Sequence, residues 1–182
     1  MKNQDRRIKY TKSVLKETLI TLLKTKPINK ITIKELCEKA DINRSTFYTH
    51  YQDQYDLLKT IEKEFFLEIK NHLKKFQSHN NKSELITILE HILIYIKENQ
   101  ELSKILLGDP NFSVLQKKIM LLIQEPTIKE WYQEESEYLL IFAITGSIGI
   151  IQEWLKNNMQ ETPKEIAEII TNSVYSFKKN YQ

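Results

Sequence analysis

The sequence predicts an all-α protein of about nine helices, and three observations support this fold class. Hydrophobic residues make up 41% of the 182 residues and recur at steps of three and four, which is the spacing of one face of a helix. The chain has only three Gly and four Pro, too few for a turn-rich β-sandwich or a disordered chain. No segment shows the strict alternation of a strand, and no internal repeat is visible.

Charge divides the chain into two parts. Residues 1–52 carry twelve Lys/Arg and five Asp/Glu, a balance of +7, and because the whole chain is +3 the remainder carries −4. The asymmetry indicates a polyanionic partner at the N-terminal end, although a solvated Lys-rich surface gives the same count. We expect an N-terminal three-helix domain over residues 1–52 and a C-terminal helical domain over 53–182.

The first two helices are predicted from a breaker and a cap. An amphipathic stretch over residues 5–26 forms the first helix, which Pro27 ends. Thr32 and Glu35 have the spacing of a capping box, in which the Thr32 hydroxyl accepts from the amide of Glu35 and the Glu35 carboxylate reaches back. The second helix therefore begins at this box.

A turn and a third helix follow directly. The side chains of residues 41–43 favour a turn after Ala40, and Asn43 caps a helix over residues 44–49. Two helices joined by three or four residues form a helix-turn-helix, and the small Ala40 lets them cross closely.

Six further helices are predicted in the C-terminal domain. The stretch 141–151 is nearly apolar all round, which indicates a helix buried on every side. Thr162 and Glu165 form another capping box, with Pro163 at the first helical position. The expected helices are 53–73, 83–99, 101–107, 112–123, 134–158 and 163–177.

Polar side chains gather on the short third helix. Arg44, Ser45, Thr46, Tyr48 and His50 suit phosphate or base-edge contacts, with the first three as candidates for base edges. The helix suits a DNA major groove, and the free amides at the Thr32 terminus attract a phosphate oxygen.

This segment resembles the N-terminal DNA-binding domain of the TetR/AcrR family of bacterial transcriptional regulators. The likeness covers residues 8–58 and rests on Thr32, Ala40, Ile42, Phe47, Tyr48, His50, Tyr51 and Leu57. It implies double-stranded operator DNA as a partner. The candidate DNA contacts are Thr32, Lys34, Asn43, Arg44, Ser45, Thr46, Tyr48, His50, Tyr51 and Gln54.

Two residues depart from the family pattern. Asp41 stands where the family commonly has glycine, and aspartate can still adopt the left-handed turn conformation. Gln54 stands where a lysine usually meets a phosphate, so we expect weaker and less salt-sensitive binding, for which the basic arm over residues 2–12 compensates.

Residues 138–154, followed by Pro163, resemble a C-terminal domain found in many Firmicutes members of the family, including the dihydroxyacetone-kinase regulator branch. This resemblance implies that the last two helices form a homodimer interface, with Gly146 and Gly149 permitting close approach. An intramolecular core helix with incidental glycines is the alternative. The candidate interface residues are Gly146, Gly149, Ile150, Glu153, Trp154, Ile166, Ile170 and Val174.

Aromatic residues of the C-terminal domain suggest a pocket for a small-molecule effector. Packing in the core explains the same residues, so both interpretations stay open. The candidates are Phe65, Phe66, Tyr95, Phe112, Trp131, Tyr138 and Phe142.

Several function classes lack support in the sequence. Cys37 is the only cysteine, so no intrachain disulfide forms, and its apolar helix favours packing over a nucleophilic role. The histidines at 72, 79 and 91 form no metal pattern, and no catalytic constellation is present, so we expect no metal, no cofactor and no enzyme. Without a signal-like start or a run of about 18 apolar residues, we expect a cytoplasmic protein with no membrane partner.

These observations predict a transcriptional repressor that binds a palindromic operator as a homodimer and is released by a small-molecule effector of unknown identity. The alternative is a co-regulator whose C-terminal domain binds a protein partner instead of a metabolite.

Overall fold

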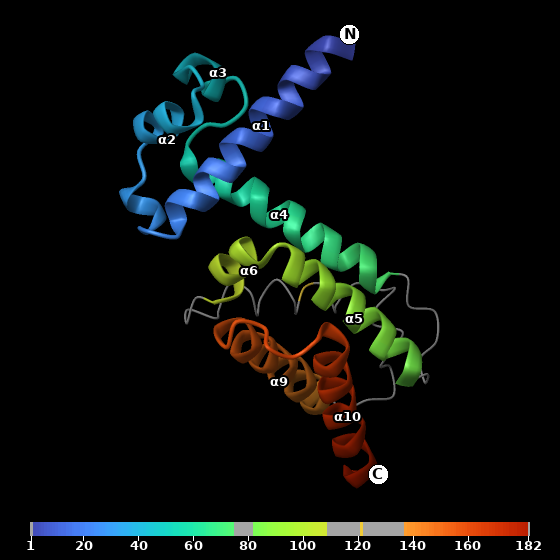
Figure 1. The fold of residues 1–182 in the computed structure, drawn as a ribbon. Helices are drawn as coiled ribbons and strands as arrows, with labels where there is room; N and C mark the ends of the chain where they lie inside the picture. The colour runs from blue at the N-terminus through green and yellow to red at the C-terminus, as the bar shows by residue number, and fades with distance from the viewer. Residues whose placement is uncertain (1, 75–81, 109–120, 122–136, 182) are drawn as a thin grey trace. The chain divides into compact units, whose positions relative to one another are not determined.

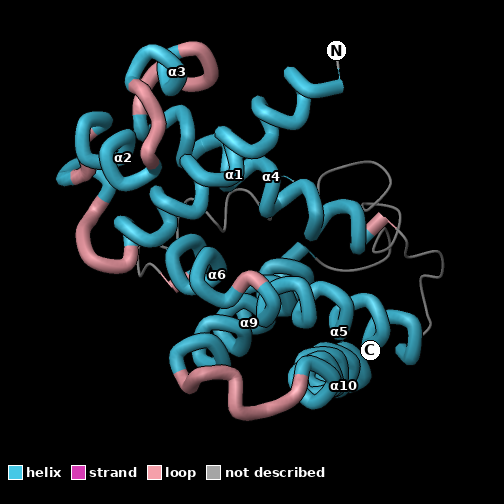
Figure 2. Tube along the Cα trace, turned by 45° about the horizontal axis from the view of Figure 1, so that its top comes forward, coloured by secondary structure: helices cyan, strands magenta, loops and turns pink. Residues whose placement is uncertain are grey.

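The computed structural model describes residues 2–74, 82–108, 121 and 137–181 (Figure 1). These residues contain eight α-helices, one short 3-10 helix and no strand (Figure 2), which confirms the all-α class. The helix expected over residues 112–123 lies outside the described residues, apart from residue 121. The chain forms two compact units, residues 1–66 and 67–182.

The first unit contains the predicted helix-turn-helix. Helix α1 packs against α2, and α2 packs against α3, around buried leucines of α1 and Phe47 of α3. The unit also includes the first part of α4, where Leu57, Ile61 and Phe65 are buried. Its elements are α1 (Lys2–Leu23), η1 (Ile28–Lys30), α2 (Ile33–Ala40), α3 (Arg44–Tyr48) and the first part of α4 (Gln54–Leu73).

Local signals place these helices close to where we expected them. Helix α1 ends at Leu23, three residues before the expected end, and the amides of Thr25 and Lys26 bond to the Leu22 carbonyl ahead of Pro27. Asp53 caps α4, since its Oδ1 accepts from the amide of Asp56 at 2.8 Å.

The second unit is a group of packed helices around an aliphatic core. Helix α10 packs along α5, and α9 contacts both α10 and α6. Ile92, Leu93 and Ile96 of α5 and Ile166 and Ile170 of α10 are buried in this core. The described helices are α5 (Lys82–Glu98), α6 (Gln100–Leu107), α9 (Glu137–Lys156) and α10 (Pro163–Tyr181).

Helix α9 departs from two expectations. We predicted that it is buried on every side, but only Ile148, Trp154 and Leu155 are buried, because no element of the described chain covers its other faces. It is also long and apolar enough to cross a membrane by length and composition, although we expected no such segment, and only 17% of the apolar window is buried. Core helices of soluble proteins satisfy the same criterion, so α9 is weak support for a membrane protein.

Candidate nucleic-acid interface

Helix α2 begins with a partly formed capping box. The Thr32 hydroxyl accepts a hydrogen bond from the amide of Glu35 at 3.2 Å, as predicted. The Glu35 carboxylate instead accepts from the Lys26 ammonium at 2.7 and 2.5 Å. Either donor would give the carboxylate a charge-assisted bond, and the Lys26 ammonium also brings a full positive charge to it. The expectation of a reciprocal box at Thr32 was therefore half right.

The turn between α2 and α3 is held in a left-handed conformation. Asp41 has φ 52° and ψ 42°, which confirms that aspartate can replace glycine here. The amide of Ile42 donates to the Cys37 carbonyl at 3.0 Å, the long-range bond of a Schellman-type helix end. This geometry sets the direction in which α3 leaves α2.

Helix α3 is capped at its start and anchored by one aromatic residue. The Asn43 Oδ1 accepts from the amide of Ser45 at 2.9 Å and from its hydroxyl at 3.0 Å. The Phe47 ring is fully buried, whereas Arg44 is exposed and Tyr48 is 57% exposed. Arg44 and Tyr48 are four residues apart and so lie on one face of the helix. The short helix thus presents a fixed outer face.

Most candidate DNA contacts lie at the surface of this unit. The exposed ones are Thr32, Lys34, Asn43, Arg44, Ser45 and Tyr48, and the half-buried ones are Thr46, His50 and Gln54. Their accessibility is compatible with a contact to a groove or a phosphate.

Tyr51 differs from the other candidates. It is 4% exposed, its ring lies 5.8 Å from that of Phe47, and its buried hydroxyl has no hydrogen-bond partner among the described residues. Burial raises the pKa of the Tyr51 phenol, and the nearby Glu64 and Asp56 carboxylates raise it further. We therefore assign Tyr51 to the core of the unit and no longer place it among the DNA contacts.

An open hollow of about 540 Å³ follows α2 and the turn. Cys37 lies in it and is buried, and burial raises the pKa of the thiol, although Arg44 opposes the shift. A thiol with a raised pKa is a poor nucleophile, which agrees with a packing role. The lining residues are Lys34, Cys37, Glu38, Asp41, Ile42, Asn43 and Arg44.

The predicted dimer residues divide into two sets. Trp154, Ile166 and Ile170 are buried within the chain, and the Trp154 Nε1 donates to the Glu161 carbonyl at 3.0 Å. We predicted all three for the interface, and the structure contradicts this because their side chains already pack inside their own unit. Gly146, Gly149 and Glu153 are exposed, while Ile150 and Val174 are half-buried.

Exposed apolar residues of α9 and α10 were missed as interface candidates. Tyr138 is 85% exposed, and Ile141 of α9 and Ile169 of α10 are also exposed. A Cβ atom at Gly146 or Gly149 would meet nothing within 4 Å. Steps of three and four residues from Gly149 toward the N-terminus lead to Gly146, Phe142 and Tyr138. The prediction instead followed the helix toward the C-terminus, to Trp154. We call the exposed residues Tyr138, Ile141, Phe142, Gly146 and Gly149 the α9 face.

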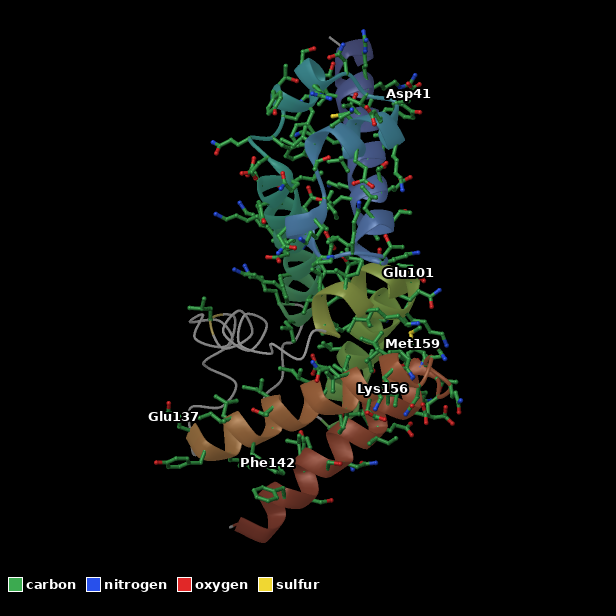
Figure 3. The ribbon with its side chains drawn as sticks, turned by 90° about the vertical axis from the view of Figure 1, so that its left-hand side faces the viewer. Asp41, Glu101, Glu137, Phe142, Lys156 and Met159 are labelled. Atoms are coloured by element: carbon green, nitrogen blue, oxygen red, sulfur yellow. The ribbon has the colours of Figure 1, made fainter. Side chains whose placement is uncertain are left out.

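The described aromatic candidates do not gather around one cavity. Tyr138 and Phe142 are exposed, so they do not line an internal cavity, and Phe142 projects from α9 toward α10, where its ring stacks on Phe177 at 4.2 Å (Figure 3). Phe65 and Phe66 contact each other edge to face in the first unit. Phe112 and Trp131 lie outside the described residues.

A half-open cavity of about 480 Å³ does exist in the second unit, between α6 and α9. No predicted aromatic residue is among its described lining, which is Lys104, Gly108, Gly149, Gln152, Glu153, Leu155 and Lys156. Tyr95 lies apart from it, with its ring 6.4 Å from that of His72. The described residues hold no group of three or more His, Cys, Asp or Glu side chains suited to a metal ion.

Comparison with known proteins gives relatives of one functional class. YxbF of Bacillus subtilis, named as an uncharacterized HTH-type transcriptional regulator, is 38% identical over 47 residues, 26% of this chain and 12% of that protein. DhaS of Lactococcus lactis, named as the HTH-type dhaKLM operon transcriptional activator, is 29% identical over 103 residues, 56% of this chain and 52% of DhaS. The chain thus spans about half the length, or less, of the curated relatives it matches.

Solved structures share the fold over most of the chain. A TetR transcriptional regulator from Streptococcus agalactiae superposes with a TM-score of 0.68 and 25% identity, covering 94% of this chain and 97% of that one. The DhaS activator has a TM-score of 0.60 and 19% identity, with 93% and 96% covered. FadR from Bacillus subtilis, solved with stearoyl-CoA, has a TM-score of 0.64 and 14% identity, with 89% and 96% covered.

The family comparison agrees with the resemblance found in the helix-turn-helix. The TetR C-terminal family, described as a transcriptional regulator C-terminal region, matches residues 83–176, which is more than half of the chain. The chain belongs to the TetR family of transcriptional regulators.

Proposed function

We propose that the protein binds a palindromic operator as a homodimer and represses the promoter that the operator overlaps. The observation that carries this proposal is the outer face of α3, where Arg44 and Tyr48 are exposed on a helix held by the Asn43 cap and the buried Phe47. A preorganised short helix of this kind suits a major groove about 12 Å wide.

The exposed residues suggest a division of roles at the DNA. Arg44, with Ser45 and Thr46 beside it, is suited to base edges, because a guanidinium can donate two hydrogen bonds to guanine. Thr32, Lys34, Asn43, Tyr48 and His50 are suited to phosphates, which fix the register of the protein on the duplex. Gln54 supplies a hydrogen bond without a charge, so it contributes little to the salt dependence of binding.

A second copy of this chain is the proposed occupant of the α9 face. Exposed apolar patches on soluble proteins mark interaction sites, and a twofold interface uses the same patch on both subunits. The space around Gly146 and Gly149 leaves room for a helix to approach closely. The α3 helices of the two subunits would then contact half-sites about 34 to 36 Å apart, or a multiple of this distance.

Effector release and the sign of regulation complete the proposal. We propose that a small molecule bound in the second unit lowers operator affinity, as expected if it binds the DNA-free conformation more tightly. The stearoyl-CoA bound to FadR belongs to a neighbour of low identity and does not name a ligand for this chain. The activator name of DhaS supports activation instead of repression, and transcript levels in a deletion strain would separate the two outcomes.

A protein partner for the second unit is the competing proposal. The observation that supports it is that the described lining of the cavity contains none of the predicted aromatic residues. Stabilisation of the purified protein by a metabolite pool, seen as a raised Tm, would argue for an effector, since a ligand that binds only the folded state stabilises it. In either case a cytoplasmic location follows from access to DNA.

DNA reading can be tested with the full chain and duplexes selected from a random-sequence pool. Arg44→Ala should weaken binding to the selected duplex by about 1 to 3 kcal/mol, roughly 5- to 150-fold, with little change in binding to unselected duplex. Lys164→Ala is the matched control, since it removes an exposed cation of the second unit. Unchanged affinity when Arg44→Ala and Tyr48→Ala are combined would remove the DNA-reading proposal.

Dimerisation can be tested by filling the space at Gly149. Within one chain a Cβ atom there meets nothing within 4 Å and Gly149 is exposed, so Gly149→Leu should fold normally. In a dimer the added side chain would separate the two α9 helices, and sedimentation should show a shift from dimer to monomer. Lys97→Leu adds the same side chain on α5 and should stay dimeric. A Gly149→Leu protein that remains a dimer would place the interface elsewhere.

A further inference from the structure

The second and third turns of α1 carry an unusual concentration of positive charge. Arg6, Arg7, Lys9 and Lys12 lie within seven residues, and no acidic residue stands between them. All four are exposed. We call this set, together with Tyr10, the α1 basic patch.

The helical phase shows that the patch faces away from the core of its unit. Thr11, Leu15 and Leu22 mark the buried face of α1. Arg6, Lys9 and Tyr10, at steps of three and four residues, lie on the opposite face, and Tyr10 is 68% exposed. Packing within the first unit therefore does not account for the residues of the patch.

Three other lysines of the same unit have carboxylate partners. Lys16 pairs with Glu64, Lys26 with Glu35 at 2.5 Å, and Lys34 approaches Glu38 at 3.9 Å. Among the side chains that the structure describes, which begin at Arg6 in α1, none forms an ion pair with the four cations of the patch. Arg6, Lys9 and Lys12 stand three residues apart, so their like charges are neighbours on the helix surface and repel each other, and the patch does not serve helix stability.

The α1 basic patch and helix α3 belong to the same compact unit. The N-terminal end of α1 and helix α3 lie at the same end of that unit in both ribbon and tube views (Figures 1 and 2). A duplex read by α3 presents a continuous row of phosphates, one negative charge per about 1.7 Å of helix axis.

We infer that the α1 basic patch is a second DNA contact, outside the helix-turn-helix, which binds phosphates beside the half-site that α3 reads. The inference rests on the proposed DNA-binding function. Arg6 and Lys9 supply the central charges, Arg7 and Lys12 flank them, and the Tyr10 hydroxyl can donate to a phosphate oxygen. Such contacts hold the protein on DNA without reading sequence, and they offset the missing charge at Gln54.

The test compares the salt dependence of DNA binding by two charge-matched variants of the full chain. Arg6→Gln combined with Lys9→Gln removes two charges and keeps good helix formers. Lys97→Gln combined with Lys164→Gln removes two exposed charges from the second unit. Dissociation constants are measured between about 50 and 200 mM NaCl, the range over which phosphate contacts dominate the affinity change. The probes are a selected duplex and a random-sequence duplex of the same length.

The patch variant should lose affinity for both duplexes by the same factor. The slope of log K against log salt should become shallower by about 0.9 for each phosphate that the variant no longer neutralises, while the control variant keeps the wild-type slope. Circular dichroism should show wild-type helix content for both variants, because the substituted side chains are exposed.

Three outcomes would overturn the inference. An unchanged slope in the patch variant would show that the patch does not touch phosphate, while wild-type binding would leave the proposed function standing. An equal change in the control variant would show that net charge, and not a contact, sets the slope. Failure of the wild-type protein to bind either duplex would remove both the inference and the proposed function.

Discussion

The α2–α3 region and the α9–α10 region show two different relations between pattern and structure. At α2 and α3 the Thr32 cap, the Asp41 turn and the Asn43 cap all lie where the sequence predicts them. At α9 the apolar pattern predicted burial on every side, and the structure buries only Ile148, Trp154 and Leu155. Caps and turns are bonds within a few residues, whereas the burial of a helix face depends on what packs against it.

The glycines sharpen this comparison. Gly108 ends α6, and a Cβ atom there would lie 2.3 Å from the Lys104 carbonyl oxygen, so the chain itself requires a glycine. Gly146 and Gly149 have open space around them. No contact of a Cβ atom within the chain therefore requires glycine at these two positions.

The largest change in stability is expected at Phe47, the one buried residue that anchors α3. Phe47→Ala should destabilise the first unit by about 3 to 5 kcal/mol, because it leaves a cavity beneath α3. Tyr48→Ala on the exposed side should change stability by about 0.5 kcal/mol or less. Hydrogen exchange of the α2 amides reports the stability of this unit. If Phe47→Ala lowered the free energy of unfolding by less than about 1 kcal/mol, the helix caps alone would be holding α3 in place.

An intermediate effect is expected at the glycines. Gly108→Ala should destabilise the second unit by about 1 to 3 kcal/mol, since the methyl group overlaps the backbone of α6. Gly146→Ala should leave the monomer as stable as wild type or up to about 1 kcal/mol more stable, because alanine favours a helix interior. Urea unfolding, at a protein concentration low enough to keep the chain monomeric, measures the stability of both variants. An equal loss of stability in Gly108→Ala and Gly146→Ala would mean that α9 is covered by another part of its own chain.

The smallest change in stability is expected at the capping box of α10. This box has both of its hydrogen bonds, whereas the box of α2 has only one. Glu165 accepts from the Thr162 amide at 2.7 Å and from its hydroxyl at 2.8 Å, and these bonds lower the pKa of the carboxyl. A lowered folded-state pKa contributes stability above the unfolded-state pKa, and this contribution is lost as the pH falls through the folded value.

Carboxyl chemical shifts should therefore show Glu165 titrating below the usual range of glutamate. Glu165→Gln should remove this part of the acid dependence of unfolding and leave the remainder unchanged. A Glu165 that titrates at its ordinary value would mean that the box opens in solution.

The sequence by itself determined the helical class, the caps and the helix-turn-helix. These features depend on hydrogen bonds and backbone preferences that span three to five residues, such as those of Thr32, Asn43 and Thr162. The resemblance to the TetR family rested on the same segment, so family membership also followed from the sequence.

Only the tertiary structure decided which partner or face each side chain uses. It turned Tyr51 inward, paired Glu35 with Lys26, directed Trp154 to Glu161 and left Tyr138 at the surface. In each case the outcome depends on groups that are distant in sequence or on competition among several possible partners. A helical pattern fixes the spacing of side chains along one element, but the surrounding elements select which side of that element is covered.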